Sequence, residues 1–536
     1  MILSKTDMES LFYMVSHQPF LCNIFPPFSP KILTLFSNCA TMGIMISIDK
    51  KGCIMKTKTQ DPHISFYDAE VHHGKNAGKI IAFYAFFISA SFLIATPIAM
   101  RLTGETETFW ENLIRIFTSP SKLVTDYFRL GGLGSTFFNA AICGLACNAI
   151  ILLSRVKASA TTFAGYMLVV AHCFYGLNFV NMWPPFVGVL LYCVITKKPF
   201  RENVHVSLFS TALAPFISDF LFRYTLFGEF ELGEPQITVF GVVLAIIFGL
   251  AAGFVVPALL PGTAAMHRGF NMYKAGLAIG ILGIFIYSFM YKTLGVTGPD
   301  ALAIENSAYD ALPYQYRGFM NVFFLILFSA TIAMGYFFNR RSFNGYKQLI
   351  QSTGYGTDFL DKFGMPVCLI NIGVYGLCIL AYLNVIFILP EIFPFLPQGV
   401  GFTGATVGVT FAALTFAADG QHPRTVAPIV LGYVLLLALV CSICAIFGAS
   451  APWTLSTQGY INGLAFATGL CPFAGKYGWK IGVLAGFISA IICTSTASMH
   501  GGFVLYNGGF NAGLTALVLL PVLDFYKITP KYEDDV

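Results

Sequence analysis

Long apolar segments recur along most of this 536-residue chain, and they constrain its fold more than any other feature. A helix needs about 20 apolar residues to cross the hydrocarbon core of a bilayer. Segments of this kind lie at 79–100, 133–154, 161–180, 205–223, 238–258, 275–291, 319–338, 366–388, 401–418, 426–448, 479–493 and 505–523. Shorter apolar pieces at 186–196 and 461–473 are half-helices or further spans. The sequence therefore predicts an all-α fold, a polytopic transmembrane helical bundle of about 11–14 spans.

Composition excludes several classes of protein. Hydrophobic residues make up 56% of the chain and charged residues 11%, whereas soluble proteins contain about 25% charged residues. The charged residues are too few to cover the surface of a soluble enzyme. The net charge of +5 is too small to indicate a nucleic acid as partner. We expect an integral, multi-pass protein of the cell membrane, with the lipid bilayer as its surroundings.

Residues 1–78 form a polar segment that differs from the rest of the chain. One apolar stretch in it, 32–48, is long enough for a marginal membrane helix, but it contains Ser37, Asn38 and Thr41. Met55 then opens a polar stretch that leads into the first strong span. We hypothesise that Met55 is a true or alternative start and that residues 1–54 are dispensable. Mass spectrometry of the native N-terminus would decide this.

An internal duplication divides the remaining chain into two homologous halves. Several pairs of residues recur at nearly constant spacing. These pairs are Asp126 and Asp358, Gly132 and Gly364, Asn139 and Asn371, Gly249 and Gly482, His267 and His500, and Tyr273 and Tyr506. The chain then consists of a first membrane repeat at 79–291, an external loop at 292–318, a second repeat at 319–525 and a polar tail at 526–536. Pseudo-symmetric halves of this kind are typical of secondary transporters.

Basic residues in the loops predict the orientation of the two repeats. Loops 101–130 and 339–365 each contain four Lys or Arg residues, whereas 224–237 contains none and 292–316 contains one. Cytoplasmic loops are enriched in Lys and Arg, so we expect the first pair of loops to be cytoplasmic and the second pair external. The two basic loops occupy equivalent places in the repeats. The sequence therefore predicts a parallel repeat, in which both units enter the membrane with the same polarity.

A Met-His-x-Gly-Phe-x-x-Tyr motif occurs once in each repeat, at 266–273 and 499–506. Glycine permits non-helical backbone, which is tolerated at membrane depth only where it is buried in protein or lines a polar cavity. One interpretation is a pair of re-entrant elements that bring together His267, His500, Tyr273 and Tyr506. The other is a tight turn at the level of the lipid headgroups. No H-x-x-H or H-E-x-x-H pattern accompanies the motif, so we predict no metal site.

Polar residues within or beside the spans are further candidates. Asn139 and Asn371 should face the interior of the bundle, where they coordinate a solute or ion or make an interhelical hydrogen bond. Asp126 and Asp358 precede the same spans, where Thr-Asp favours a helix N-cap and gating or cation attraction is the alternative.

Two interruptions and one charged residue also stand out. The segments 178–185 and 419–424 interrupt apolar regions and predict broken helices or polar loops. The alternative for the second segment is that His422 and Arg424 are topogenic residues on the cytoplasmic side. Asp219 lies in an apolar segment one turn from Arg223, so it is either a functional charge or part of a helix-end ion pair.

The segment Gly509-Phe510-Asn511-Ala512-Gly513-Leu514 resembles the GFNAGL signature of an uncharacterised membrane protein family, the domain of unknown function 1576. The segment 125–140 also resembles the first half of that family, so the likeness covers about 79–525. The corresponding stretch of the first repeat, 269–277, departs from the signature. The resemblance implies a multi-spanning membrane protein and no particular activity.

The leading hypothesis is a transporter or channel for a small neutral solute or ion, with a path between the two halves. The path candidates are Asn139, Asn371, His267, His500, Tyr273, Tyr506, Asn511, Asp126 and Asp358. The scarcity of charge within the spans argues against a highly charged substrate. If transport is coupled, a proton could pass through His267 or His500.

Two other classes of function remain open. An intramembrane enzyme that acts on a lipid would need a charged cluster such as DDxxD, and the chain contains none. We therefore expect no enzyme and no cofactor. A non-transporting scaffold or sensor is the remaining alternative, although such proteins typically carry a soluble signalling domain.

Overall fold

The computed structural model describes residues 48–49, 52–53, 76–120, 122, 125–156, 159–226, 237–296, 317–393, 396 and 401–532. Residues 1–68 belong to one compact unit and residues 69–536 to another. The first unit contains an antiparallel pair of short strands, β1 (Ile48–Asp49) and β2 (Gly52–Cys53). Apart from Ile48, the marginal helix predicted at 32–48 and the proposed start at Met55 lie outside the described residues.

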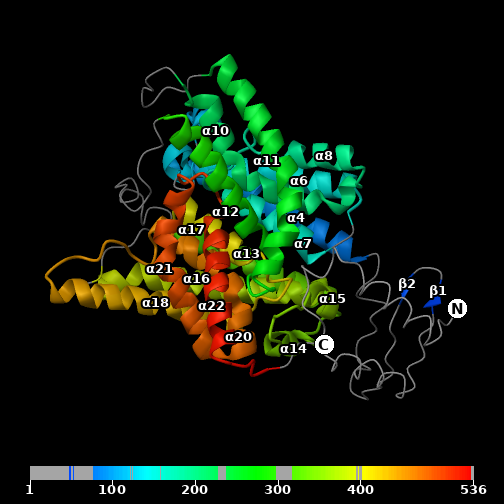
Figure 1. Ribbon diagram of the computed structural model, residues 1–536, viewed down its shortest axis with the longest axis vertical. Coiled ribbons are helices and arrows are strands. Elements are labelled where there is room, and N and C mark those ends of the chain that lie inside the picture. Colours follow the sequence, from blue (N-terminus) through cyan, green and yellow to red (C-terminus); the bar gives the residue numbers. More distant parts are fainter. Residues whose placement is uncertain are drawn as a thin grey trace, which may run out of the picture. The chain divides into compact units, whose positions relative to one another are not determined.

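The second unit is helical throughout its described part, and its elements repeat in the same order (Figure 1). The first half contains α4 (Asn76–Thr103), α5 (Phe109–Thr118), α6 (Tyr127–Leu153), α7 (Ala160–His172), α8 (Trp183–Thr196), η1 (Phe200–Glu202), α9 (Val204–Ser210), η2 (Thr211–Leu213), α10 (Ala214–Phe222), α11 (Val239–Met266), α12 (Lys274–Tyr287) and the π-helical η3 (Ser288–Thr293). The second half contains α13 (Arg317–Phe338), α14 (Tyr346–Gln351), α15 (Phe359–Phe363), α16 (Met365–Ile392), α17 (Gly404–Ala413), α18 (Pro423–Ile446), α19 (Gln458–Ala467), η6 (Thr468–Leu470), α20 (Cys471–Tyr477), α21 (Trp479–Met499) and α22 (Asn507–Phe525).

Ten helical segments in the described part are long and apolar enough to cross a bilayer, when contiguous helices are counted as one. The predicted spans at 161–180 and 401–418 are instead the short helices α7 and α17, each followed by a non-helical segment. Apolar composition alone did not distinguish a full span from a short helix and its loop, because both are buried among other helices.

The duplication extends to details of the backbone. Gly132 and Gly364 are equivalent residues, and their φ angles are 78° and 80°. Each glycine interrupts the helix that follows Asp126 or Asp358, in the left-handed region that side chains disfavour. The two halves therefore share a local break as well as the order of their helices.

The two halves run in opposite directions. The ring of Phe83, near the start of α4, lies 6.2 Å from that of Phe338 at the end of α13. Further along α4, the ring of Phe92 lies 5.3 Å from that of Phe323, which is earlier along α13. Since these equivalent helices are antiparallel, the repeat is inverted. The predicted parallel repeat is wrong.

A second pair of equivalent helices, α12 and α22, is antiparallel too. They cross where Gly276 meets its equivalent Gly509 so closely that a Cβ on Gly276 would lie 2.4 Å from the carbonyl carbon of Gly509. Arg268, just before α12, pairs at 2.7 Å with Asp524 near the end of α22. The pseudo-two-fold axis therefore passes through this crossing, perpendicular to the helices.

Inversion places equivalent segments at opposite ends of the bundle. We name the two ends of the bundle after Asp126 and Asp358. The helices α4, α10 and α12 end at the Asp126 end, and α6 and α13 begin there. At the Asp358 end, α11 and α22 finish and α12 begins. The basic loops 101–130 and 339–365 are at opposite ends, so the prediction that both are cytoplasmic is wrong for one of them. Counting basic residues failed because the two loops carry equal numbers of them.

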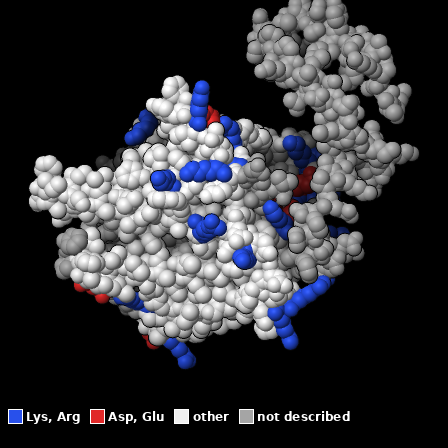
Figure 2. Space-filling model, turned by 90° about the horizontal axis from the view of Figure 1, so that it is seen from below, with Lys and Arg blue, Asp and Glu red and all other residues white. Residues whose placement is uncertain are grey.

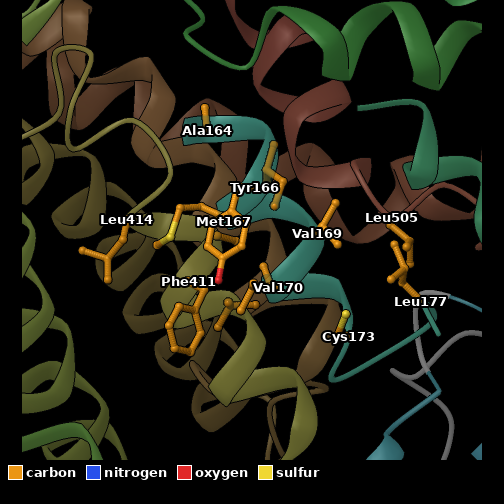
Figure 3. Packing of buried hydrophobic residues seen from close by; sticks show 14 of the residues in the cluster. Ala164, Tyr166, Met167, Val169, Val170, Cys173, Leu177, Phe411, Leu414 and Leu505 are labelled. Carbon is orange, nitrogen blue, oxygen red and sulfur yellow. The ribbon is translucent and has the colours of Figure 1, made fainter. Parts of the chain in front are cut away.

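The short helices α7 and α17 pack against each other in the core. Figure 3 shows Met167 and Val170 of α7 near Phe411 of α17 and Leu414 just beyond it, and none of the four is more than 1% exposed. Gly408 allows a close approach, because a Cβ there would lie 2.3 Å from a carbonyl oxygen of α7. The centre of the molecule is thus built from one short helix of each half.

Candidate functional site

Two helical hairpins enter the bundle from opposite ends. The first consists of α7, residues 173–182 and α8. Its α7 begins at the Asp358 end, where Thr161 and Lys274 line the small cavity that is described below. The second consists of α17, residues 414–422 and α18; its first residue, Gly404, donates its N–H to Asp126 at 2.9 Å. The interruptions predicted from the sequence are therefore the turns of these hairpins. Because the hairpins are equivalent, the short helices α7 and α17 are antiparallel.

One asparagine of each half holds the tip of its hairpin. Asn139 and Asn371 are fully buried, and each donates through Nδ2 to two carbonyl oxygens of the tip. These carbonyls belong to Cys173 and Leu177 for Asn139 (2.9 and 3.0 Å), and to Ala417 and Gln421 for Asn371 (2.8 Å each). The hydrogen-bonding role that the sequence allowed is present in both halves. Coordination of a solute by these residues stays a prediction.

We expect Asn371→Leu to lower the free energy of unfolding by about 2–3 kcal/mol, because two buried carbonyl groups lose their donor. Asn139→Leu should have a similar effect, and the midpoint of unfolding in detergent measures both. Asn112→Leu is the control, since it removes only an exposed hydrogen bond to Thr108 and should change stability by less than about 0.5 kcal/mol. An Asn371→Leu protein as stable as the wild type would contradict this role.

Each His-Gly motif forms a tight turn at the end of a long helix. His267 and His500 directly follow α11 and α21, and positive φ angles at 268–269 and 501–502 reverse the chain. The His500 ring lies 3.0 Å from the side-chain oxygen of Asn507, whereas neither ring nitrogen of His267 has a partner among the described residues. The two turns are at opposite ends of the bundle, so the structure does not bring the two histidines together.

The chain after each turn docks onto the other half. Met272 donates its N–H to the carbonyl of Gly469 in η6, and Leu505 donates its N–H to the carbonyl of Ala212 in η2, each at 3.0 Å. Both acceptors lie in 3₁₀ turns that interrupt a helix. These equivalent bonds join the halves on either side of the pseudo-two-fold axis.

Tyr273 and Tyr506 do come together, at a small cavity between the halves, which we call the central cavity. Its volume is about 40 Å³, which is enough for a water molecule or two. Tyr273 donates its hydroxyl to the carbonyl of Ala412 at 2.5 Å. Tyr506 is 1% exposed, and its hydroxyl has no partner in the described part of the chain. A buried polar group without a partner costs free energy, so this hydroxyl marks a place where a ligand would be stabilised.

Asp419 and Lys274 give the central cavity its charge. The Asp419 carboxylate makes no hydrogen bond or close ion pair with any described residue. Burial raises its pKa to about 7; Asp358 adds to the rise and Lys274 opposes it. Neither residue is among the path candidates predicted from the sequence, although Asp419 is the first residue of the interruption at 419–424. A search for duplicated polar residues passes over Asp419, because its counterpart in the first half is Tyr175.

A larger lateral cavity lies among α16, α17, α18 and α19, with a volume of about 290 Å³. Its lining contains exposed Cys378 and Ala427, at the mouth between α16 and α18. Deeper in the lining, the hydroxyls of Tyr375 and Tyr382 are buried and have no partner among the described residues, and Thr468 lies nearby. No charged side chain is among the described residues that line this cavity. The mouth lies between transmembrane helices, so it faces the bilayer.

The remaining candidates stabilise helices. Asp126 and Asp358 accept hydrogen bonds from backbone N–H groups in the first turns of α6 and α15, which is the N-cap geometry that the sequence favoured. Burial raises the pKa of Asp126 to about 6. Asn511 donates to the hydroxyl of Ser489 at 2.9 Å and so links α22 to α21. These residues do not line either of the two cavities.

The face of the molecule seen in Figure 2 shows no large cluster of charged side chains among its described residues. Figure 2 shows Lys and Arg as separate side chains scattered over one largely uncharged face. Within the described ranges, no three His, Cys, Asp or Glu residues are grouped so that they could hold a metal ion. The central and lateral cavities are therefore the candidate sites.

Comparison with known proteins agrees with the duplication. A family model described as "Protein of unknown function (DUF1576)" matches the chain twice, at residues 105–292 and 338–525. No curated protein and no solved structure matches the chain. One match lies in each inverted half, the first beginning after α4 and the second at the end of α13. The resemblance inferred from the sequence is confirmed. The chain belongs to the DUF1576 family, and its two copies of the family domain form one all-α membrane protein.

Proposed function

We propose that the protein is a secondary transporter for a small neutral solute and that it acts in the cell membrane. One observation carries this proposal: the hairpins α7–α8 and α17–α18 enter an inverted repeat from opposite ends and pack at its centre. Inverted repeats with interrupted helices are a common construction of secondary transporters. Two equivalent halves can exchange conformations, and the path then opens first to one side of the membrane and then to the other.

The lateral cavity favours a solute with an apolar body and a few hydrogen-bonding groups. Its volume of about 290 Å³ is roughly twice that of an engineered 150 Å³ cavity that binds benzene. A charged solute would lack a partner in a lining without charged residues. The hydroxyls of Tyr375 and Tyr382 would each gain a hydrogen bond from a suitable solute. A scaffold that binds nothing gives no reason for these two hydroxyls to stay unpaired, and so we favour transport.

A bulky apolar maleimide that modifies Cys378, at the mouth of the lateral cavity, would fill the cavity. We therefore expect the uptake of small neutral solutes into proteoliposomes to fall at least about tenfold. The Cys378→Ser variant, treated in the same way, should keep its uptake, and it controls for labelling of Cys441 and Cys444. Full uptake by the labelled wild type would remove the lateral cavity from the path. If no solute crosses faster than in protein-free liposomes, the transport proposal fails.

A further inference from the structure

We propose that transport is coupled to protons and that the carboxyl group of Asp419 is the group that binds the proton. This inference rests on the proposed transport function. Asp419 lies between α17 and α18, outside the helices that cross the bilayer. It lines the central cavity together with Tyr273 and Tyr506, which come from the two different halves. A change in its charge would therefore act where the halves meet and where one hairpin turns.

Three features of the cavity point to a ligand at this carboxylate. Asp419 is partly buried and has no direct partner in the described chain. The buried hydroxyl of Tyr506 lines the same cavity and is also unpaired. Lys274 is also a lining residue, and it forms no ion pair with Asp419. Asp419 therefore shares a cavity with a basic residue, and the hydrogen-bonding capacity of its carboxyl group is unused.

The charged residues Asp419 and Lys274 each lack a charged equivalent in the other half, although the fold is symmetric. The hydrogen bonds of Asn139 and Asn371 align the two hairpin tips, and this alignment makes Tyr175 the equivalent of Asp419. The spacing of Tyr273 and Tyr506 makes Asn507 the equivalent of Lys274. The first hairpin therefore has a neutral pair where the second has a carboxylate and an amine. Because the two halves share a fold but differ in these charges, the state open to one side of the membrane differs in energy from the state open to the other side. Coupling to an ion gradient requires such a difference.

The chemistry of the site favours a proton over a metal cation. Sodium or calcium ions need several oxygen ligands around them, whereas Asp419 is the one carboxylate among the described residues that line this cavity of about 40 Å³. Lys274 beside it would repel a metal cation. A proton needs only one oxygen lone pair. A hydronium ion in the surrounding water supplies it: one O–H bond of hydronium breaks as an O–H bond forms on the carboxylate. The carboxyl O–H bond breaks again when a water molecule takes the proton back.

The groups that act on Asp419 come from several elements. Asp358 and the exposed Asp361 of α15 disfavour its negative charge, and Lys274 of α12 favours it. The thiols of Cys368 and Cys471 are the other titratable groups that interact with it. The ring of His422 is directed to the carbonyl of Ser352. Burial is the largest influence, and it raises the pKa of Asp419 from 3.8 to about 7.

The pH dependence of unfolding tests the proton site without any need for transport. The folded protein holds this proton up to about pH 7, whereas an unfolded chain releases it near 3.8. The stability of the wild type relative to Asp419→Asn should therefore decrease as the pH rises from about 4 to about 7, and then stay constant. The folding equilibrium should change by roughly a hundredfold to a thousandfold across this window. The protein is the full chain in detergent.

Two matched variants sharpen this result. Glu107→Gln removes an exposed carboxylate that is not among the groups acting on Asp419, so it should follow the wild type. Lys274→Gln removes the charge that lowers the pKa of Asp419, so its titration should extend to higher pH. If folded Asp419→Asn shows the same pH dependence as the wild type, the proton site is wrong. Should that variant not fold, Asp419→Glu, which keeps the carboxyl group, must retain the titration.

Flux measurements separate this inference from the proposed function. An imposed pH gradient should drive solute accumulation in wild-type proteoliposomes, whereas Asp419→Asn should give exchange without accumulation. Wild-type transport that is indifferent to the gradient would overturn the coupling and leave transport intact. If the wild type moves no solute but shows the pH-dependent unfolding, transport and its coupling both fail, and Asp419 is a proton-binding group only.

Discussion

Arg223→Met should lower the free energy of unfolding by about 3–5 kcal/mol, because it leaves a buried carboxylate without its counter-charge. Asp219 is fully buried, and its two oxygens accept hydrogen bonds from Arg223 at 2.6 and 2.9 Å. Tyr291 donates a third hydrogen bond to the same carboxylate. The helix-end ion pair that the sequence suggested is thus present, and it ties the end of α10 to η3.

Two comparisons identify the cause of that loss. The double variant Asp219→Asn/Arg223→Met removes both charges and should recover most of the stability, since the cost comes from the isolated carboxylate. Arg268→Met breaks a pair with Asp524 whose side chains are 49% and 56% exposed, and it should cost no more than about 1 kcal/mol. The midpoint of unfolding in detergent measures all three variants. Equal effects of Arg223→Met and Arg268→Met would contradict the importance of burial.

Gly276→Leu should destabilise the protein by about 3 kcal/mol or more, because its side chain cannot fit between α12 and α22. A Cβ at this position would lie 2.4 Å from the carbonyl carbon of Gly509 and 2.6 Å from its Cα. The contact is between backbones, so no side-chain rotation relieves it. The halves would have to separate at the crossing on the pseudo-two-fold axis.

Gly262→Leu is the matched control, because an added side chain at Gly262 of α11 meets no atom within 4 Å. It should retain wild-type stability and give a single monodisperse peak in size-exclusion chromatography. Gly276→Leu should instead aggregate or elute as an expanded species. Wild-type behaviour of Gly276→Leu would show that the two helices can move apart at little cost.

The helical membrane class and the duplication were predictable, because both depend on residue type and spacing. Apolar segments, the pairs Asp126/Asp358 and Tyr273/Tyr506, and the interruptions at 178–185 and 419–424 are visible in one sequence. The relative direction of the halves was not predictable in this way. It depends on which helices pack together, and the equal numbers of basic residues in loops 101–130 and 339–365 gave a misleading signal.

The candidate site was predictable only where it follows the symmetry. Tyr273 and Tyr506 were selected as a duplicated pair, and they do meet at the central cavity. His267 and His500 were selected by the same reasoning, but inversion separates them to opposite ends. Asp419 breaks the symmetry and so escaped selection. Its burial and its distance from any partner are properties of the packed tertiary structure.

Inversion also bears on how such a chain arose. The first half begins at the Asp358 end and finishes at the Asp126 end, so a second copy joined to it starts from the opposite side and is automatically reversed. A single ancestral half would have had to insert in both orientations and pair with itself as an antiparallel dimer. Nearly balanced loop charges would have permitted both orientations. Fusion of two such copies would fix one copy in each orientation, and residues such as Asp419 would then be free to diverge on one side of the membrane alone.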